Sequence, residues 1–377
     1  MIQIRNAHIV TANESFIGSM QTLQDQISEV SSGAQSLVGE DWQGDYCLPG
    51  LVELHTDNLE KHLMPRPKVR WPTMPAIIAH DAQVAAAGIT TVLDAIAVGD
   101  IDSDSMRNDT LIACIDGLRT AADAGILRAD HFLHLRLELA EKNLQDMFAN
   151  LVDDERLKLV SLMDHTPGQR QWTDLSHYRT YVMGKRGWSN EKVDAMLEVL
   201  QERQQTYVAS NRRSVIQSCK NRAQPVPLAT HDDTTLAHVH EGVEEGVTIS
   251  EFPTTVEAAV AAHQHKLGII MGAPNMVRGG SHSGNVSAAE LARADLLDVL
   301  SSDYVPASLL HAAFMLQEQG FALAKAIATV SLNAANMVGL TDRGQIKAQH
   351  RADFLRVRVV QGIPIVLGVW KAGARIV

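Results

Sequence analysis

The segment LPGLVELHTDN, residues 48–58, brings an imidazole and a carboxylate close together. A Pro-Gly turn leads into a short apolar run that ends in His55 and Asp57. Side chains two residues apart on a strand point to the same face, so this pair could hold one divalent cation. Polar residues also end many strands that bind nothing. This segment by itself does not separate the two interpretations.

Other histidines and carboxylates stand at the ends of later apolar runs. They are Glu138, His165, His231 and Asp303. Imidazole and carboxylate groups suit Zn²⁺, Mn²⁺ or Fe²⁺. Each residue also has an ordinary interpretation, since a lone histidine is more often a core residue and Asp303 could cap the helix after Pro306. Their joint occurrence at successive run ends favours a metal site.

Eight apolar, β-branched runs could position these residues. They cover residues 51–55, 89–96, 132–139, 157–163, 226–230, 247–252, 267–273 and 298–303. Helical patterns lie between most of them, for example at 74–87, 256–265 and 288–297. Alternation of strand and helix predicts parallel pairing. Eight such units predict an α/β fold, a (β/α)8 TIM-type barrel, whose sites lie at the carboxyl ends of its strands.

The two ends of the chain are rich in β patterns. Residues 1–50 and 340–377 predict a small β-sandwich domain built from both termini, and residues 51–339 form the expected barrel. The barrel carries a long insertion at about 168–222, with a helix expected over 191–208 and Ser189 as its N-cap. The insertion could be a solvated flap or a lid over the site.

Composition excludes several other classes of protein. A net charge of −11 over 377 residues argues against generic binding to nucleic acids or anionic membranes. The three cysteines are widely spaced and odd in number, so they predict neither a disulfide framework nor a Cys-x-x-Cys metal site. There is no pattern of a signal peptide or a membrane span. We therefore expect a cytoplasmic protein, and a homodimer is the common default for its oligomeric state.

A glycine-rich segment, residues 272–285, suggests an anion site. It precedes a helix that opens with Ser287 and Glu290, the pattern of a capping box, and backbone N–H groups before a helix can bind phosphate. The candidate phosphate-binding residues here are Asn275, Arg278, Gly279, Gly280, Ser281 and His282. Alternatively, the glycines only form a tight turn. Arg66, Lys68 and Arg170 follow metal-bearing runs and could also meet phosphates, whereas Arg212 and Arg213 are expected on the surface.

Several long segments of the sequence resemble those of the amidohydrolase superfamily. They are VELHTDNLEKH (52–62), PRPKVRWP (65–72), SLMDHTPGQRQW (161–172), LATHDD (228–233), TISEFPTT (248–255) and GAPNMVRGGSHSGN (272–285). Within the superfamily they are most similar to the triphosphate diphosphatases of phosphonate catabolism. The segments GQIK at 344–347 and Ala352-Asp353 resemble the usual return segment of its terminal β domain.

The resemblance implies one or two divalent ions held by His55, Asp57, His165 and His231, with Glu138 as the candidate bridge between two ions. Asp303 would accept the proton from the attacking water. That water would attack the α-phosphorus of a ribose 1-methylphosphonate 5-triphosphate and release pyrophosphate. The chain departs from the common superfamily pattern in two ways, since Asp57 replaces the second histidine of His-x-His and no lysine stands where many relatives carry a carboxylated one.

Two other functions remain open from the sequence. One is another amidohydrolase reaction, such as cyclic amide hydrolysis or deamination, whose less charged substrates need few phosphate donors. The other is a non-catalytic barrel that serves as a partner in a pathway complex. The presence of all five strand-end residues, His55, Asp57, His165, His231 and Asp303, argues against a degenerate relative.

Overall fold

The computed structural model of the protein describes residues 1–33, 38–66, 69–100, 107–170, 175–186, 189–281 and 284–377. The chain divides into two compact units. The first unit contains Met1–Asp94, Asp116–Phe132 and Met271–Val377, and the second contains Ala95–Ile115 and Leu133–Ile270. Each unit is described by itself below.

Eight parallel strands follow one another in one sheet in chain order, as the alternating pattern predicts. They are β6 (Leu51–Thr56), β7 (Ile89–Val98), β8 (Asp130–Glu138), β9 (Leu157–Met163), β10 (Leu228–His231), β11 (Ile249–Glu251), β12 (Gly268–Gly272) and β13 (Val299–Ser301). Each lies in or overlaps one of the eight expected runs. Thr56 and Asp303 form a parallel bridge between the first strand and the end of the last, which confirms the TIM-type barrel.

The strand β7 shows why the pattern identifies these elements. Every residue of β7 is buried, which is typical of parallel strands that are covered on both faces. The helices that alternate with the strands are α1 (Asn58–Leu63), α2 (Thr73–Ala86), α3 (Arg107–Asp123), α4 (Leu144–Ala149), α8 (Leu236–Glu245), α9 (Val256–Gln264), α10 (Ala273–Arg278), α11 (Ala288–Arg293), α12 (Ser308–Glu318), α13 (Leu323–Ala328) and α14 (Leu332–Met337).

Side chains at the helix starts decide several boundaries. The hydroxyl groups of Thr235, Thr255 and Ser287 each accept a hydrogen bond from the backbone N–H three residues later. The expected N-cap at Ser287 is therefore confirmed. The helix that follows it ends at Arg293, four residues earlier than expected. The chain leaves the helix at Ala294, and Asp295 has a left-handed backbone with φ of +58°.

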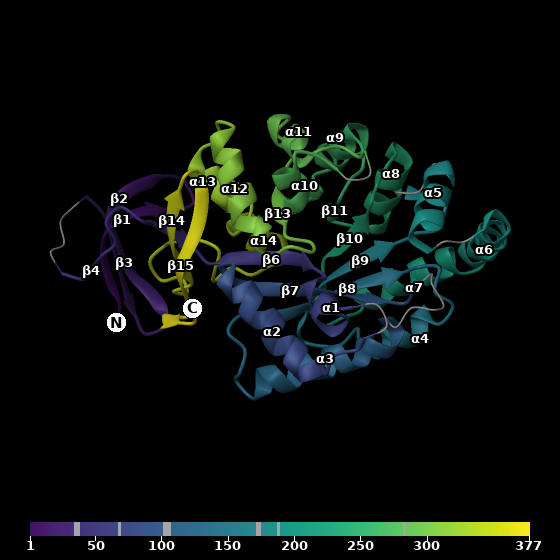
Figure 1. Ribbon diagram of the computed structural model, residues 1–377, viewed down its shortest axis with the longest axis horizontal. Helices are drawn as coiled ribbons and strands as arrows, with labels where there is room; N and C mark the ends of the chain where they lie inside the picture. The colour runs from purple at the N-terminus through teal and green to yellow at the C-terminus, as the bar shows by residue number, and fades with distance from the viewer. Residues whose placement is uncertain (34–37, 67–68, 101–106, 171–174, 187–188, 282–283) are drawn as a thin grey trace. The chain divides into compact units, whose positions relative to one another are not determined.

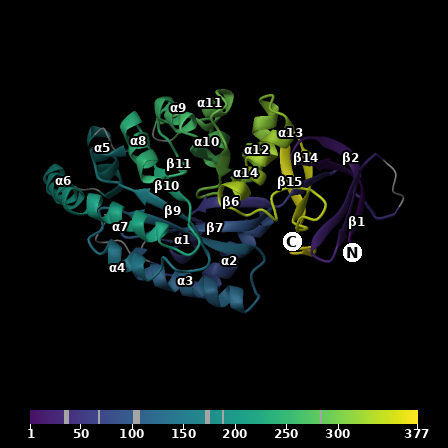
Figure 2. The ribbon, with the colours of Figure 1, turned by 180° about the vertical axis from the view of Figure 1, so that it is seen from behind.

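A second sheet is built from both ends of the chain, within the first unit. Its strands are β1 (Gln3–Val10), β2 (Ser15–Leu23), β3 (Gln26–Ser32), β4 (Glu40–Asp41), β5 (Tyr46–Pro49), β14 (Phe354–Val360), β15 (Ile363–Lys371) and β16 (Ala374–Arg375). They are ordered β16-β15-β14-β5-β1-β2-β3, with β4 beside β1. Both termini lie at this sheet (Figure 1, Figure 2). That it is a separate sandwich domain bounded at residues 50 and 340 stays a prediction.

Aromatic residues from both termini form the core of this sheet. Trp42 is fully buried, with its ring 5.7 Å from that of Trp370 and 6.2 Å from that of Phe354. The rings of Phe354 and Trp370 stack at 4.8 Å. Because large aromatic side chains bury the most apolar area, these contacts join the N-terminal and C-terminal strands into one body.

Asp130, at the start of β8, holds the segment that returns to this sheet. Its carboxylate accepts hydrogen bonds from Arg343 at 2.8 Å, Arg351 at 2.5 Å and Lys371 at 3.1 Å. Burial opposes the charged form, but the three cations prevail and lower the pKa of Asp130 to about 2. The anchor is therefore charged at neutral pH.

The insertion forms a run of helices in the second unit. They are α5 (Leu175–Arg186), α6 (Asn190–Arg203), a π-helical stretch η2 (Gln204–Val208) and α7 (Ala209–Lys220). They lie side by side in both views (Figure 1, Figure 2). The Ser189 hydroxyl accepts from the Lys192 N–H, so the predicted N-cap is confirmed. The expected helix continues beyond residue 208, because the π-helical stretch leads directly into α7.

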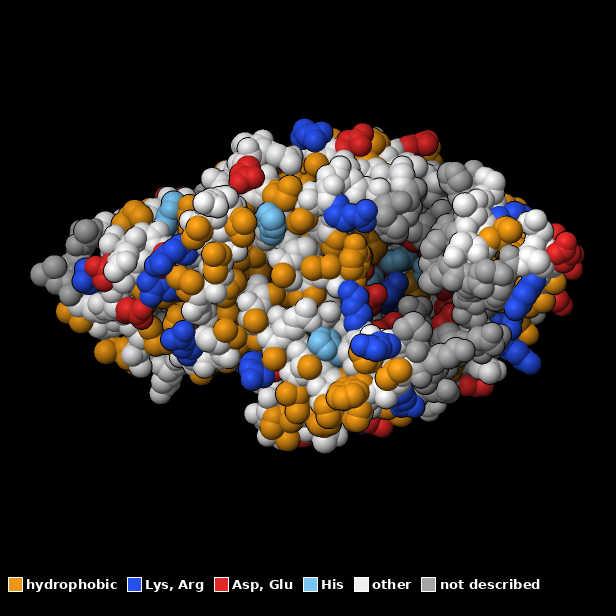
Figure 3. Space-filling model, viewed as in Figure 1, with side chains coloured by type: hydrophobic (Ala, Val, Ile, Leu, Met, Phe, Trp, Pro, Cys, Tyr) orange, Lys and Arg blue, Asp and Glu red, His pale blue; other side chains and the backbone are white. Residues whose placement is uncertain are grey.

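No described helix is long and apolar enough to cross a membrane. On the face drawn in Figure 3, acidic and basic side chains are interspersed over the surface. The net negative charge therefore does not form one continuous acidic field on this face. The three cysteines, Cys47, Cys114 and Cys219, are buried, and no disulfide bond joins them.

A buried charged cluster lies in the first unit. His80 Nε2 is 2.7 Å from Oδ1 of Asp94, and His131 Nδ1 is 2.7 Å from Oδ2 of the same carboxylate. His131 Nε2 lies 3.4 Å from Oδ1 of Asp81. Burial alone would lower the pKa of His131, but the carboxylates of Asp94 and Asp81 raise it to about 9. Burial lowers the pKa of His80, which stays neutral and accepts at Nδ1 from Asn58.

This cluster predicts a pH-dependent stability. A histidine with a raised pKa in the folded state stabilises it fully below about pH 6.5, and that contribution is lost as the pH rises through about 9. We predict that His131→Gln lowers the free energy of unfolding at pH 6.5 by an amount of the order of 2 kcal/mol and flattens its decline towards pH 9. Chemical denaturation across this range measures both effects. His263→Gln, at an exposed histidine, should keep the wild-type slope. An unchanged slope in the His131 variant would contradict the assignment.

Candidate metal and catalytic site

The strand β6 places two predicted metal ligands in the first unit. His55 is buried, and Asp57 follows the strand directly. Asp57 occupies the N-cap position of α1, yet its side chain makes no capping hydrogen bond. Its Oδ1 atom is buried and has no hydrogen-bond partner among the described residues. A buried carboxylate oxygen without a partner is costly unless a cation binds it, so Asp57 fits a metal-ligating role.

The backbone of Asp303 is fixed to this ligand strand. Its N–H donates to the His55 carbonyl at 3.0 Å, and its carbonyl accepts from the Asp57 N–H at 3.1 Å. The Thr56 hydroxyl donates to the same carbonyl at 2.7 Å. Asp303 also has a left-handed backbone, with φ of +53°. Three hydrogen bonds thus fix the backbone of Asp303, the predicted proton acceptor, beside the predicted ligands His55 and Asp57.

A fully buried carboxylate in the middle of β6 strengthens this junction. Glu53 accepts from the His55 N–H at 2.7 Å and from the Ser302 N–H at 2.6 Å, and the Ser301 hydroxyl also donates to it. Burial raises the pKa of Glu53, although these donors oppose the rise. The first and last strands of the barrel are therefore joined by side-chain as well as backbone hydrogen bonds.

The second unit brings together three other potential ligands. His165, His231 and Asp232 each offer an atom, and these atoms lie within 4.8 Å of one another. Two imidazoles and a carboxylate at this spacing form a donor set that Zn²⁺, Mn²⁺ or Fe²⁺ accepts. His165 and His231 are the histidines that the sequence predicts, whereas Asp232 was not among the expected ligands.

Each of these histidines is oriented by a buried glutamate. His165 Nδ1 is 2.7 Å from Glu138 Oε2, and His231 Nδ1 is 2.9 Å from Glu251 Oε2. When Nδ1–H donates to a carboxylate, Nε2 becomes the basic nitrogen that can ligate a metal. Burial lowers the pKa of His165, but Glu138 prevails and raises it. Glu138 thus has contacts that suit an orienting carboxylate.

Glu251 belongs to a longer series of buried, hydrogen-bonded side chains, which was not expected from the sequence. The Ser161 hydroxyl donates to Glu251 at 2.8 Å, and His134 Nε2 lies 2.6 Å from the same hydroxyl. Glu251 ends β11, so the strand-end rule that found His231 could have found it too. Asp232 follows His231 directly, so its position next to a predicted ligand is the signal that could have found it.

Left-handed residues mark the ends of three barrel strands. Asp232 has φ of +58°, Phe252 of +54° and Asp303 of +53°, directly or shortly after β10, β11 and β13. Such backbone conformations are uncommon outside glycine and concentrate at functional sites. They turn the chain sharply at the strand ends, next to the candidate site residues.

The predicted glycine-rich phosphate loop has another local structure. Residues 273–278 form the short helix α10, and the N–H groups of Gly279 and Gly280 donate to the carbonyls of Met276 and Asn275. These N–H groups end a helix, so at Gly279 and Gly280 they do not form the expected backbone cradle. That the segment binds phosphate stays a prediction. The Asn275 side chain accepts from the Ala288 N–H at 2.9 Å and donates to the Val286 carbonyl at 3.3 Å, which joins α10 to α11.

The remaining predicted phosphate contacts differ in their exposure. Arg66 and Arg278 are exposed and Ser281 is partly buried, whereas Arg170 is 5% exposed. Lys68 and His282 lie outside the described residues. Arg213 is exposed as expected, but the same expectation is wrong for Arg212, which is only 5% exposed. Its position on α7 points it inward, and nothing in the local sequence pattern predicts what α7 packs against.

The glutamate contact generates a test of metal binding. We predict that Glu251→Gln weakens the binding of Mn²⁺ or Zn²⁺ about 10- to 100-fold, because it removes the carboxylate that orients His231. Isothermal titration calorimetry on metal-stripped protein measures this affinity. Glu198→Gln, at an exposed glutamate of α6, is the matched control. Equal affinities for the two variants would refute the orienting role.

Comparisons with known proteins place the chain in a family. No protein-family model matches the chain. The α-D-ribose 1-methylphosphonate 5-triphosphate diphosphatase of Escherichia coli (strain K12) is 44% identical over 382 residues, which cover 99% of both chains. Among solved structures, a dihydropyrimidinase from Brevibacillus agri NCHU1002 has a TM-score of 0.59 at 12% identity, over 99% of this chain and 94% of that one.

An N-acetyl-D-glucosamine-6-phosphate deacetylase from Mycobacterium smegmatis has a TM-score of 0.61 at 14% identity, with both chains fully covered. A crystal structure described as an amidohydrolase has a TM-score of 0.62 at 15% identity, over 99% and 98% of the two chains. Similarity at these identities shows the fold alone. The fold is that of the amidohydrolases, and the chain belongs to the family of the α-D-ribose 1-methylphosphonate 5-triphosphate diphosphatase.

Proposed function

We propose that the protein hydrolyses α-D-ribose 1-methylphosphonate 5-triphosphate to the 5-phosphate and pyrophosphate, in the catabolism of phosphonates. The observation that carries this proposal is the full-length similarity, at 44% identity, to a diphosphatase named for that substrate. The fold adds support, because amidohydrolase barrels place their catalytic groups at the carboxyl ends of the strands. A cytoplasmic location and a homodimer stay predictions.

The donor groups of the chain fit a divalent metal. We propose that His55, Asp57, His165 and His231 hold it. The support is the partnerless Asp57 oxygen in one unit and the histidine cluster in the other. When bound, a divalent ion lowers the pKa of a coordinated water and offsets negative charge on phosphoryl oxygens. Asp232 joins the candidate ligands, and the contacts of Glu138 favour orientation of His165 over the bridging role that it was expected to have.

Asp303 is our candidate for the group that accepts the proton of the attacking water. A general base must be held at a fixed position, and the backbone of Asp303 is fixed to β6 by three hydrogen bonds. The water would attack the α-phosphorus, the bond from that phosphorus to the bridging oxygen would break, and pyrophosphate would leave. Arginine side chains suit the leaving group because their planar guanidinium matches phosphate oxygens.

Phosphorus NMR of the purified protein with Mn²⁺ or Zn²⁺ and ribose 1-methylphosphonate 5-triphosphate tests the proposal. We expect pyrophosphate as the product, and we expect Asp303→Asn to lower the rate by about 10²- to 10⁴-fold. Asp295→Asn is a matched control, because Asp295 has the same left-handed backbone but an exposed side chain. It should keep the wild-type rate.

Other products would separate the alternatives. Release of orthophosphate would mean that the γ-phosphorus is attacked, and the proposed orientation of the substrate would be wrong. No turnover by protein that binds metal would reject the diphosphatase function, and cyclic amides and deaminase substrates would be tested next.

A further inference from the structure

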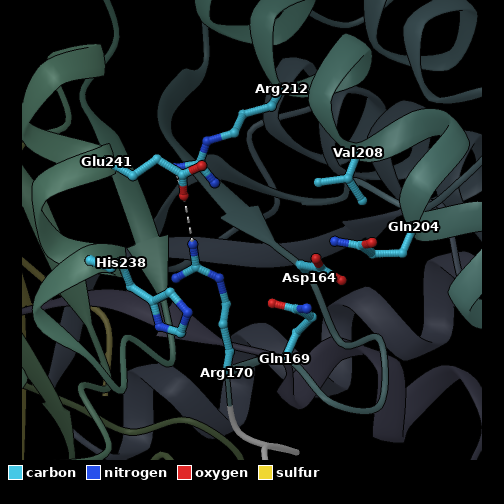
Figure 4. A pocket seen from close by; sticks show the side chains of 9 residues that line it. Asp164, Gln169, Arg170, Gln204, Val208, Arg212, His238 and Glu241 are labelled. Atoms are coloured by element: carbon cyan, nitrogen blue, oxygen red, sulfur yellow. Dashed lines mark hydrogen bonds and ion pairs between the residues drawn. The ribbon is translucent and has the colours of Figure 1, made fainter.

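A pocket of about 250 Å³ lies within the second unit (Figure 4). Three parts of the chain line it: the segment after β9, the insertion helices and α8. The lining residues on which the argument depends are Asp164, Arg170, Val208, Arg212, His238 and Glu241. Gln204, Val208 and Arg212 are four residues apart, which places them along one side of the η2–α7 helix. The insertion therefore supplies one wall of the pocket.

The two arginines of the pocket are buried and paired with carboxylates. Nη1 of Arg170 donates to the His231 carbonyl at 3.2 Å and to Asp233. Nε of Arg212 lies 2.8 Å from both oxygens of Glu245, and Nη2 of Arg212 lies 2.7 Å from one of them. Nη2 is buried, and its contact with Glu245 does not have the geometry of a hydrogen bond. An oxygen that approaches from the Glu241 side can therefore accept a hydrogen bond that Glu245 does not accept.

Glu241 occupies the space between the two arginines. Its Oε2 atom is 3.5 Å from Nη2 of Arg170 and 3.3 Å from Nη2 of Arg212, and its side chain is 50% exposed. Charge-assisted hydrogen bonds of this kind are normally about 2.7–2.9 Å long. In Figure 4 the Glu241 carboxylate faces the tip of Arg170. A half-exposed carboxylate at long distances is one that an incoming anion can displace into solvent.

The charges of the pocket limit which anion fits. The two guanidinium groups contact the carboxylates of Asp233, Glu241 and Glu245. Asp164 is a fourth carboxylate that lines the pocket. Burial and then the nearby Arg170 lower the pKa of His238, so it adds no third cation near pH 7. Exchange of the Glu241 carboxylate for a singly charged group leaves the total charge unchanged, whereas a doubly charged phosphate would add repulsion from Asp164. Val208 adds an apolar contact on the same wall.

We propose that this pocket binds the methylphosphonate end of the substrate, which is a singly charged phosphonate ester. In the unliganded protein, the Glu241 carboxylate occupies the position between the two arginines that the ester takes when it binds. The proposal rests on the proposed function for the identity of the substrate. The phosphonate oxygens replace Glu241 at Arg170 and Arg212, and the methyl group lies against Val208. Glu241 is therefore a specificity-determining residue that competes with the ligand.

The test measures binding without turnover. The probe is methyl methylphosphonate, a singly charged ester, titrated into metal-free protein and followed by calorimetry or by its phosphorus NMR signal. We expect Glu241→Gln to bind the probe about tenfold more tightly than the wild type, a gain of about 1.4 kcal/mol, because the internal competitor is lost. Glu244→Gln makes the same charge change at an exposed glutamate of the same helix and should bind like the wild type.

A second variant tests the arginine side of the pocket. Arg212→Lys, combined with Glu241→Gln, should abolish the gain, because lysine keeps the charge but lacks the planar fork. In turnover, Glu241→Gln should lower KM for the methylphosphonate sugar triphosphate and leave KM for ribose 5-triphosphate unchanged.

Two results would overturn the proposal. One is equal affinity of Glu241→Gln and Glu244→Gln for the probe. The other is an equal or larger gain for pyrophosphate, which would assign the pocket to the triphosphate end. Tighter binding of the probe by Glu241→Gln without turnover of any sugar triphosphate would support the pocket and reject the diphosphatase function, so the two failures are distinguishable.

Discussion

The junction between the first barrel strand and the end of the last is the constraint on which the candidate residues of the first unit depend. Asp303 exchanges backbone hydrogen bonds with His55 and Asp57 and accepts another from Thr56. Glu53 adds bonds to Ser301 and Ser302. A barrel closes only where such a register is met, and here the closing residues are also the candidate ligand and base. The same contacts therefore close the barrel and position the candidate ligand and base.

Buried carboxylates have a shared task in this protein. Glu53, Glu138 and Glu251 are each almost or fully inaccessible to solvent, and each accepts hydrogen bonds from groups that lie next to or within a candidate ligand. Burial of a carboxylate is unfavourable unless its oxygens are satisfied, so each one holds its donors in a narrow range of positions. Rigid ligands lose little entropy when they bind a cation, and this favours metal affinity.

The sequence predicts the barrel well because its strands are buried on both faces. The run at β7 is apolar or β-branched for most of its length, and the pattern gives its position within two residues. Local pattern also finds the caps at Ser189 and Ser287, whose hydrogen bonds reach only three residues along the chain. It fails where the deciding contact is distant. Arg212 is buried because of what α7 packs against. At Gly279 the contacts are local, and there the glycine-rich composition conceals the short helix α10 that ends at this residue.

The span of the junction has a consequence for the order in which the protein is made. The hydroxyl of Thr56 and the carbonyl of Asp303 are 247 residues apart in the chain. During synthesis, β6 leaves the ribosome long before residue 303 is made. The edge of β6 that will face Asp303 therefore stays unpaired while the later strands and helices are synthesised. The N-terminal strands of the second sheet wait even longer, for β14. A nascent chain released early would carry His55 and Asp57 on an open edge, prone to pair with another chain before any site had formed.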